Sequence, residues 1–211
     1  MVDIAIIDYG MGNLRSVRQA LQAVAPAASV VVTDNPQEVL GASRVVFPGQ
    51  GAMPDCIREL EARGLRAALL HAARTKPFLG ICIGLQMLFE HSEEGDTPGL
   101  GILPGSVVRF ANNLCDAEHG KLKVPHMGWN QVHHGGHPLW KGIDQDARFY
   151  FVHSYYVCPK DTELVQATSC YPQAFTCAVA RDNLFAVQFH PEKSQDAGLR
   201  LLKNFVNWAP I

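Results

Sequence analysis

The sequence predicts an α/β fold with a central, mostly parallel sheet that is flanked by helices and extended by antiparallel strands. Two observations lead to this prediction. In the first half of the chain, short apolar runs alternate with segments whose apolar residues recur at helical spacing, and repeated βα units of this kind indicate a parallel sheet. From about Gly99 onward, short strand patterns separated by turn residues predominate, which is typical of antiparallel strands.

Each expected element of the first half follows from a local pattern. The apolar run at residues 2–7 predicts a buried strand, and the apolar residues between Leu14 and Val24 share one face of a helix. The same criteria predict further elements before residue 90. Strands are expected at residues 30–32, 45–47 and 77–81, and helical segments at 36–40, 57–73 and 85–89.

The second half is expected to add antiparallel strands and a final helix. Residues 181–183 have the composition of a hairpin turn, and Ser194 is a candidate N-cap for a helix with Leu201, Leu202 and Phe205 on one face. The strands are expected at residues 107–110, 129–132, 149–157, 176–180 and 184–189. Because no repeat or interdomain linker interrupts these elements, residues 1–211 are expected to form one domain.

Composition and charge argue against several classes of function. The formal net charge is −2 and only 18% of the residues are charged, with no long run of either sign, so neither nucleic acid nor an anionic membrane is an expected partner. The first eight residues include two acids and no base, and no apolar stretch approaches twenty residues. We therefore expect a soluble, cytoplasmic protein. The six cysteines include no Cys-x-x-Cys pair, so reduced thiols are expected.

Cys82 has the most informative setting in the sequence. It lies between an apolar run that predicts a strand and a segment of helical character, with Gly80 and Gly84 two residues to either side. This is the layout of a nucleophile elbow, in which a sharp strand-to-helix turn lifts a nucleophile clear of the sheet. The backbone N–H of Ile83 would then point to the place where an oxyanion forms.

His190 and Glu192 are the candidate partners of this nucleophile. His190 follows the strand expected at 184–189, so it should reach the same sheet edge as Cys82. If the extended geometry continues, Glu192 projects to the same side and can orient the imidazole as a general base. Gln50, in the Pro-Gly-x-Gly loop after the strand at 45–47, is the candidate second oxyanion donor.

Other interpretations of these residues remain open at this point. His190 beside Glu192 also fits an ordinary surface pair, the Pro-Gly-x-Gly loop also fits a plain turn, and the elbow alone fits any cysteine hydrolase or peptidase. The roles of His126 and Trp129 are open among core, substrate wall and interface. A metal interpretation of the cluster His133, His134 and His137 lacks a completing ligand. We therefore expect a solvated hairpin tip there, and no metal or other cofactor.

Three motifs carry a resemblance to a known family. Gly-x-Cys-x-Gly-x-Gln at 80–86, Pro-Gly-x-Gly at 48–51 and His-Pro-Glu at 190–192 resemble the class I glutamine amidotransferases, whose triad-type glutaminase domains release ammonia from glutamine. The order of Cys82, His190 and Glu192 agrees with that family. Residues 8–14, 125–130, 150–155 and 191–194 further resemble one branch of it, the glutaminase subunits of imidazole glycerol phosphate synthases.

The resemblance implies a reaction and a substrate. Cys82 would attack the side-chain amide of L-glutamine, His190 would protonate the departing ammonia, and water would hydrolyse the γ-glutamyl thioester. In the family, the positions that match Gly51 and Gln86 line the glutamine pocket, and backbone groups that match those of Ser154 and Tyr155 hold the substrate.

The resemblance also implies a partner, a (β/α)8-barrel cyclase subunit that would use the ammonia to make imidazole glycerol phosphate and AICAR in histidine biosynthesis. Asn13, Tyr150 and Lys193 resemble partner-facing residues, although an ordinary surface role stays open for each. The alternatives are a glutaminase that feeds a different synthase and a noncatalytic partner-binding module. The His-Met-Gly-Trp-Asn stretch at 126–130 favours the histidine pathway, and the intact Cys82, His190 and Glu192 argue against the noncatalytic module.

Overall fold

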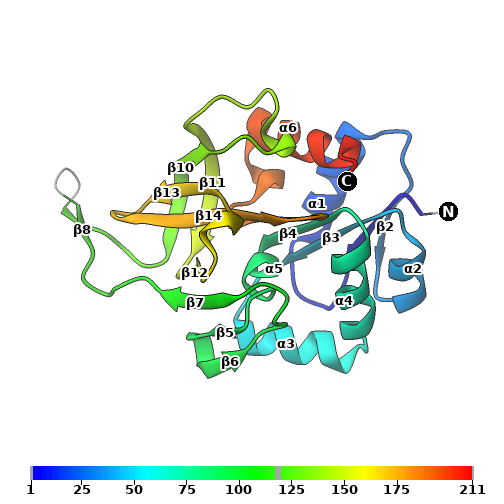
Figure 1. Cartoon of the computed structure of the whole chain (residues 1–211), viewed down its shortest axis with the longest axis horizontal. Coiled ribbons are helices and arrows are strands. Elements are labelled where there is room, and N and C mark those ends of the chain that lie inside the picture. The colour runs from blue at the N-terminus through cyan, green and yellow to red at the C-terminus, as the bar shows by residue number, and fades with distance from the viewer. Residues whose placement is uncertain (1, 117–119, 211) are drawn as a thin grey trace.

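A large mixed sheet runs through the computed structural model, which describes residues 2–116 and 120–210 (Figure 1). Its strand order is β2-β1-β3-β4-β15-β14-β12-β7-β5-β6. The first five strands of this order are all parallel to one another. They are β2 (Val30–Thr33), β1 (Ile4–Ile7), β3 (Arg44–Gly49), β4 (Phe78–Cys82) and β15 (Leu184–Val187).

Helices cover both faces of this parallel section, as its apolar strands require. One face packs against α1 (Leu14–Val24) and α6 (Gln195–Asn207), which bury Val17, Leu21 and Phe205 among other residues. The other face packs against α2 (Pro36–Gly41), α3 (Met53–Ala62) and α4 (Arg66–Thr75). A parallel strand buried on both faces must be apolar throughout, and β1, β4 and β15 are fully buried along their lengths.

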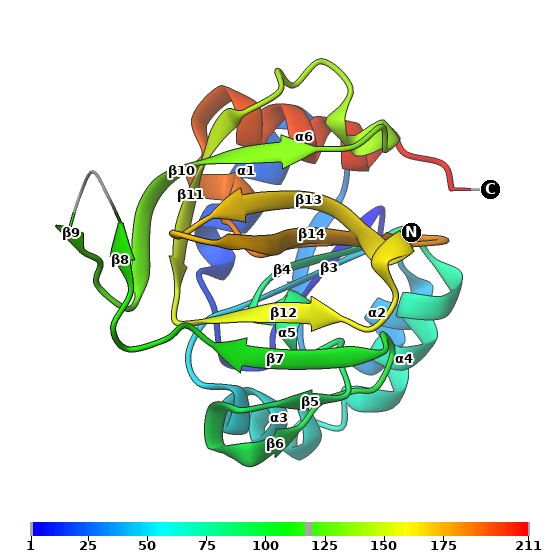
Figure 2. The same cartoon turned by 60° about the vertical axis from the view of Figure 1, so that its left-hand side comes forward.

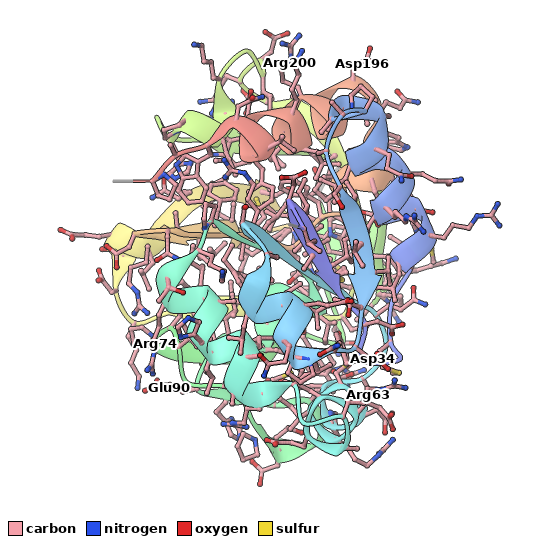
Figure 3. The ribbon with its side chains drawn as sticks, turned by 90° about the vertical axis from the view of Figure 1, so that its right-hand side faces the viewer. Asp34, Arg63, Arg74, Glu90, Asp196 and Arg200 are labelled. Atoms are coloured by element: carbon pink, nitrogen blue, oxygen red, sulfur yellow. The ribbon has the colours of Figure 1, made fainter. Side chains whose placement is uncertain are left out.

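Charged side chains lie on the outer surface of these helices (Figure 3). Arg63, which follows α3, lies 3.6 Å from Asp34, and both side chains are largely exposed. Exposed pairs of this kind contribute little to stability, so the fold depends on the two apolar cores on either side of the sheet.

The antiparallel section continues the sheet beyond β15 and then branches (Figure 2). One branch contains β14 (Ala174–Arg181), β12 (Tyr155–Pro159), β7 (Gly105–Arg109), β5 (His91–Ser92) and β6 (Thr97–Pro98). The other runs from β14 through β13 (Val165–Cys170) and β10 (His126–His134) to β11 (Ala147–His153). A separate hairpin consists of β8 (Cys115–Asp116) and β9 (Gly120–Lys121).

Short helices connect these elements. They are α5 (Ile83–Gln86) and the 3-10 turns η1 (Glu94–Asp96), η2 (Pro138–Trp140), η3 (Thr162–Leu164) and η4 (Pro191–Lys193). All six cysteines are free thiols. Within the described residues, no helix combines the length and the apolar character needed to span a membrane.

The predicted fold class is confirmed. The sheet is parallel where Cys82 lies and mostly antiparallel elsewhere, with β5 pairing in parallel with β7. Several predicted boundaries were wrong. The strand expected at 149–157 is divided at Ser154 into β11 and β12, and β13 was not predicted. The helix expected at 85–89 is α5, which ends at Gln86. Beyond Gln86 the N–H groups of Leu88 and Phe89 donate to carbonyls only three residues back, and the carbonyls of residues 87–89 accept from backbone N–H groups of residues 100–103.

Candidate active site

Cys82 occupies a sharp turn between β4 and α5. Its backbone has φ 57° and ψ −113°, a left-handed conformation that costs free energy for a residue with a side chain. The flanking glycines make the turn possible, because a Cβ on Gly80 would lie 2.9 Å from the Cβ of Ala186 and a Cβ on Gly84 would overlap the carbonyl oxygen of Phe47. The strand-to-helix turn expected from the sequence is therefore present.

His190 and Glu192 lie beside this turn because β15 pairs in parallel with β4, with Val187 opposite Ile81. The Nδ1 of His190 and Oε1 of Glu192 are 2.8 Å apart, and the two side chains are 6% and 1% exposed. The extended geometry expected for Glu192 was wrong, since residues 191–193 form the 3-10 turn η4. A turn brings the carboxylate back toward the ring, whereas an extended chain would only have placed the two side chains on one side.

The expected N-cap role of Ser194 was also wrong. Ser194 stands at the N-cap position of α6, but its side chain caps no helical N–H. Its Oγ instead donates to the carbonyl of His190 at 2.6 Å and accepts from the backbone N–H of Tyr150 at 3.0 Å. The backbone N–H of His190 donates to the carbonyl of Tyr150 at 2.9 Å. These three bonds attach the His190 backbone to β11.

The electrostatic setting of His190 favours its protonated form. Burial lowers the pKa of His190, but the negative charge available on Cys82 and the hydrogen bond and charge of Glu192 outweigh burial and raise this pKa to about 10. The buried Nε2 of His190 has no hydrogen-bond partner among the described residues. Nε2 therefore faces the Cys82 side and is available to bond with a bound molecule.

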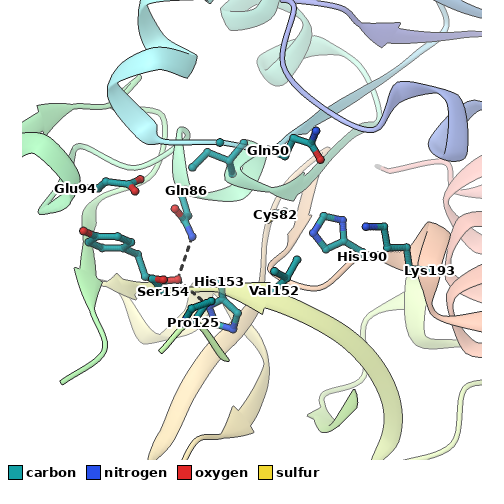
Figure 4. Close-up of a pocket in the computed structure, with 13 residues that line it drawn as sticks. Gln50, Cys82, Gln86, Glu94, Pro125, Val152, His153, Ser154, His190 and Lys193 are labelled. Atoms are coloured by element: carbon teal, nitrogen blue, oxygen red, sulfur yellow. Dashed lines mark hydrogen bonds between the residues drawn. The ribbon is translucent and has the colours of Figure 1, made fainter. Parts of the chain in front are cut away.

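A pocket of about 400 Å³ opens over Cys82 and His190 (Figure 4). This volume is in the range typical of small-molecule sites. The N-terminal half of the chain provides one set of lining residues and the C-terminal half the other. The lining residues are Gln50, Gly51, Cys82, Ile83, Gln86, Glu94, Pro125, Val152, His153, Ser154, Tyr155, His190 and Lys193.

The two candidate oxyanion donors both line this pocket. Gly49 pairs with Cys82 across β3 and β4, so Gln50 follows directly beside the nucleophile. The thiol of Cys56 donates to the carbonyl of Gln50 at 3.6 Å, which directs that oxygen toward α3. Ile83 is the first residue of α5, where backbone N–H groups have no partner within the helix.

The four residues expected to contact substrate are also brought together. Gly51, Gln86, Ser154 and Tyr155 all line the pocket. The side-chain amide of Gln86 is 3% exposed, and its Nε2 donates to the backbone carbonyl of Tyr155 at 3.0 Å, across the pocket wall (Figure 4). The break between β11 and β12 at Ser154 thus forms one side of the pocket.

Sequence reasoning missed Glu94, Pro125, Val152 and His153 as pocket residues. Glu94 is the most informative of these, because its Oε2 accepts from the backbone N–H of Met53 at 2.8 Å at the start of α3, and its side chain reaches the pocket (Figure 4). No local motif marks it. Val152 and His153 could have been found within the expected strand at 149–157, because they directly precede the predicted contact Ser154.

Comparisons with known proteins decide the family. The family model described as "Glutamine amidotransferase class-I" matches residues 5–208. The chain belongs to the class-I glutamine amidotransferase family. The amidotransferase is 65% identical to the imidazole glycerol phosphate synthase subunit HisH of Thiobacillus denitrificans, over 99% of this chain and 92% of that protein. It is 66% identical to the protein of the same name from Nitrosospira multiformis, over 100% of both chains.

A solved structure supports the fold of the amidotransferase. The crystal structure of a glutamine amidotransferase aligns with a TM-score of 0.72 at 16% identity, covering 97% of this chain and 99% of that one. The family model and the relatives agree with the resemblance expected from the Cys82, His190 and Pro-Gly-x-Gly motifs, and the solved structure agrees with the expected fold.

Two of the three predicted partner-facing residues of the amidotransferase are neighbours. The Nζ of Lys193 lies 5.8 Å from the ring centroid of Tyr150, and the Tyr150 ring packs edge-on to Trp129 at 6.1 Å. Trp129 and Met127 are 42% and 62% exposed, and within residues 2–116 and 120–210 they are the large hydrophobic residues exposed to solvent. Asn13 lies at the N-cap position of α1, where its side chain makes no capping bond, and α1 contacts η4, the turn that contains Lys193.

The expectation of a solvated hairpin tip at residues 133–137 was wrong in part. His134 stacks on Trp140 with ring centroids 4.7 Å apart, and His137 packs against Phe185 and Trp208. Burial lowers the pKa of His137 to about 4. Among the described residues, no group of three or more His, Cys, Asp or Glu side chains is arranged to hold a metal ion.

Proposed function

We propose that this chain is the glutaminase subunit of an imidazole glycerol phosphate synthase, which hydrolyses L-glutamine and supplies the ammonia to a cyclase subunit. The observation that carries the proposal is the convergence of Cys82 and His190 on one pocket, with Glu192 bonded to His190. The identity of 65–66% to proteins named as the HisH subunit supports the choice of synthase.

The proposed reaction begins with the Cys82 thiolate. Its sulfur attacks the side-chain carbonyl carbon of glutamine and the carbonyl electrons move to the oxygen, which the backbone N–H groups of Gln50 and Ile83 would stabilise. When the tetrahedral intermediate collapses, the C–N bond breaks and the nitrogen takes a proton from Nε2 of His190 and leaves as ammonia. The raised pKa of His190, about 10, supports a protonated ring at neutral pH.

Hydrolysis of the thioester completes the proposed cycle. The now neutral His190 takes a proton from water, and the resulting hydroxide attacks the thioester carbonyl. The C–S bond breaks, glutamate leaves, and Cys82 and His190 return to their starting forms. Glu192 holds Nδ1 of His190 at 2.8 Å and so keeps Nε2 directed at the reacting atoms through both steps.

Glutamine fits the polar groups of the pocket. Its α-ammonium group needs acceptors, and Glu94 offers a carboxylate whose Oε2 is engaged by Met53 and whose Oε1 has no hydrogen-bond partner within residues 2–116 and 120–210. The amide oxygen of Gln86 is a second acceptor. Backbone groups of Gly51, Ser154 and Tyr155 lie on the same wall as Gln86 and can hold the α-carboxylate and fix the position of the amide.

The proposed cyclase partner, a (β/α)8 barrel, would dock over Trp129, Met127, Tyr150 and Lys193. An exposed cluster of large apolar side chains in an otherwise polar surface marks an interaction site, and Trp and Tyr are enriched at the energetic centres of interfaces. Lys193 both lines the pocket and lies over Tyr150, so the pocket and the proposed interface are contiguous. Ammonia released at Cys82 could then pass to the partner without crossing solvent.

The test is a Cys82→Ala variant in the complex with the cyclase. Glutamine-dependent formation of imidazole glycerol phosphate should fall by more than about a thousandfold, because the nucleophile is essential, while synthesis from added ammonium salt should persist. Cys115→Ala, a change at an exposed cysteine, is the control and should keep both activities.

Two outcomes would contradict the proposal. Glutamine-dependent turnover near the wild-type rate in Cys82→Ala would show that Cys82 is not the nucleophile. Ammonia transfer to a different synthase, with none to the cyclase, would leave the glutaminase chemistry intact and replace the proposed partner.

A further inference from the structure

Gln188 is a fully buried amide in direct contact with the candidate nucleophile. It lies two residues before His190 and is 0% exposed. Its backbone N–H donates to the carbonyl of Cys177 at 2.8 Å, which continues the pairing of β15 with β14. Its side-chain Nε2 donates to the Cys82 sulfur at 3.8 Å, a long bond to a large, polarisable acceptor.

The other end of the Gln188 amide binds Gln86. The Oε1 of Gln188 accepts a hydrogen bond from Nε2 of Gln86 at 3.0 Å, and the same Nε2 donates to the carbonyl of Tyr155 at 3.0 Å. An amide nitrogen has two hydrogens, so both are used. The Oε1 of Gln86 is thereby left as the free end of this side chain in the pocket.

The backbone carbonyl of Tyr155 fixes which group donates and which accepts in the hydrogen bonds that link Tyr155, Gln86, Gln188 and Cys82. The carbonyl of Tyr155 can only accept, so Gln86 must present its nitrogen there. That nitrogen in turn requires an acceptor on Gln188, which leaves the nitrogen of Gln188 to face Cys82. A single backbone carbonyl thus determines that the nucleophile receives a donor and that the pocket receives an acceptor.

We propose that Gln188 positions the nucleophile and the substrate-binding amide as one unit. Its N–H stabilises the Cys82 thiolate, because a hydrogen bond to the charged form of a group favours that form. Its carbonyl holds Gln86 so that the free Oε1 can accept a hydrogen bond from the ammonium group of glutamine. This second role rests on the proposed glutaminase function, whereas the first concerns the cysteine alone.

Two substitutions separate these roles. Gln188→Met has a similar length and removes both the donor and the acceptor. Gln188→Glu keeps an acceptor for Gln86 and loses the N–H that faces Cys82. Gln22→Met, on the exposed face of α1, is the matched control. Each variant is compared in the complex with its partner, and its fold is checked by circular dichroism.

The first measurement is the pH dependence of Cys82 alkylation by iodoacetamide, followed by peptide mass spectrometry so that exposed cysteines do not interfere. In Gln188→Met the midpoint should move up by about one pH unit, the shift expected for loss of one hydrogen bond to a charged group. In Gln188→Glu it should move further, because a carboxylate opposes the thiolate. A merely structural role of Gln188 would not move this midpoint.

The second measurement is the steady-state hydrolysis of glutamine. In Gln188→Met the KM should rise about tenfold, since one pocket hydrogen bond is lost, and kcat should also fall. In Gln188→Glu the fall should be mainly in kcat, because Gln86 keeps its acceptor. If Gln188→Met does not fold, Gln188→Glu alone tests the proposal. Its alkylation midpoint should still move up, and its kcat should fall much more than its KM rises.

Equal midpoints and equal kinetic constants in Gln188→Met, Gln188→Glu and Gln22→Met would overturn the proposal. A loss of activity in both Gln188 variants with an unchanged midpoint would also overturn it, because the nucleophile would then not depend on this amide. If the wild-type complex released no ammonia from glutamine but the midpoint shifts were observed, the glutaminase function would fail while the link between Gln188 and Cys82 would stand.

Discussion

At the scale of single residues, the site depends on a histidine whose charge is maintained against burial. His190 is almost completely enclosed, which by itself would favour the neutral ring. The Cys82 charge and the Glu192 carboxylate outweigh that cost and raise the pKa of His190 to about 10. Glu192 is therefore expected to control the fraction of protonated His190 as well as the direction of its ring.

Replacing Glu192 with Gln tests this role. The amide keeps the shape of the side chain but removes the negative charge, so the pKa of His190 should fall. Because His190 must carry a proton when ammonia departs, the alkaline limit of kcat should move to lower pH, and kcat should fall by about a hundredfold. The measurement is a pH profile of glutamine hydrolysis.

Glu163→Gln, at a position on η3 that faces solvent, is the control for a general charge effect. An alkaline limit that stays in place in Glu192→Gln would show that Glu192 does not stabilise the protonated ring.

Local motifs predicted some residues of the pocket and could not predict others. Cys82 and His190 were predictable because each stands at the end of an apolar strand run and has diagnostic neighbours. Glu94 and Gln188 were not. Glu94 enters the pocket through its bond to Met53, and Gln188 through contacts with Gln86 and Cys82. Such contacts depend on how strands pair, which a single sequence does not specify.

At the scale of elements, η4 connects His190, the proposed general acid, to the rest of the sheet. The hydroxyl of Ser194 bonds both the His190 carbonyl and the Tyr150 N–H, and Ser194 is 1% exposed. The buried side chain of Ser194, directly after the turn, therefore holds the start of the turn against β11. A movement of β11 at Tyr150 would therefore shift the backbone of His190.

Ser194→Ala should loosen this connection. Removing the hydroxyl leaves a buried N–H and a buried carbonyl each short of one partner, which costs about 1–3 kcal/mol of unfolding free energy. The kcat for glutamine should fall as the ring loses its fixed position. Urea denaturation measures the first effect and steady-state kinetics the second.

Ser43→Ala, at an exposed serine between α2 and β3, should change neither quantity. Unchanged stability in Ser194→Ala would mean that other groups or water replace the lost bonds.

Element existence was more predictable than element geometry. The strand-to-helix turn at Cys82 followed from its glycines, but the length of α5 did not, because the chain after Gln86 tightens into bonds three residues back and is held by residues 100–103. The break between β11 and β12 could not be predicted either, since the composition of residues 149–157 favours one continuous strand. In both cases a tertiary contact overrode the local pattern.

At the scale of the whole molecule, buried histidines should make stability depend on pH. Burial lowers the pKa of His126 and His137 to about 4, and that of His153 to about 3. The unfolded chain takes up protons on these residues as the pH falls below 6.5, whereas the folded chain does not. The free energy of unfolding should therefore decrease from pH 6.5 downward.

The contribution of His190 to the free energy of unfolding depends on pH in the opposite direction. Its folded pKa is raised, so its contribution to stability is complete below 6.5 and is lost as the pH rises through about 10. It adds no slope in the acidic window. Urea midpoints between pH 5.0 and 6.5, within about one and a half units below the unfolded pKa of histidine, isolate the buried neutral histidines.

His153→Gln should flatten this dependence, because a histidine that stays neutral on folding contributes a slope of about 1.4 kcal/mol per pH unit well below its unfolded pKa. His71→Gln, at an exposed position on α4, should keep the wild-type slope. The slope is the readout, since His153→Gln also loses bonds to His126 and the Tyr155 carbonyl. Equal slopes in both variants would contradict the assignment of His153 as neutral.

The position of β15 in the sheet has a consequence for biosynthesis of the protein. This strand is made long after β4, yet it lies between β4 and β14 and pairs with both. While the ribosome is still translating the residues before β15, one edge of β4 has no partner, and open strand edges invite intermolecular pairing. His190 follows that same strand. A nascent chain therefore cannot hydrolyse glutamine before its sheet has closed, and activity appears only when the aggregation-prone edge is already covered.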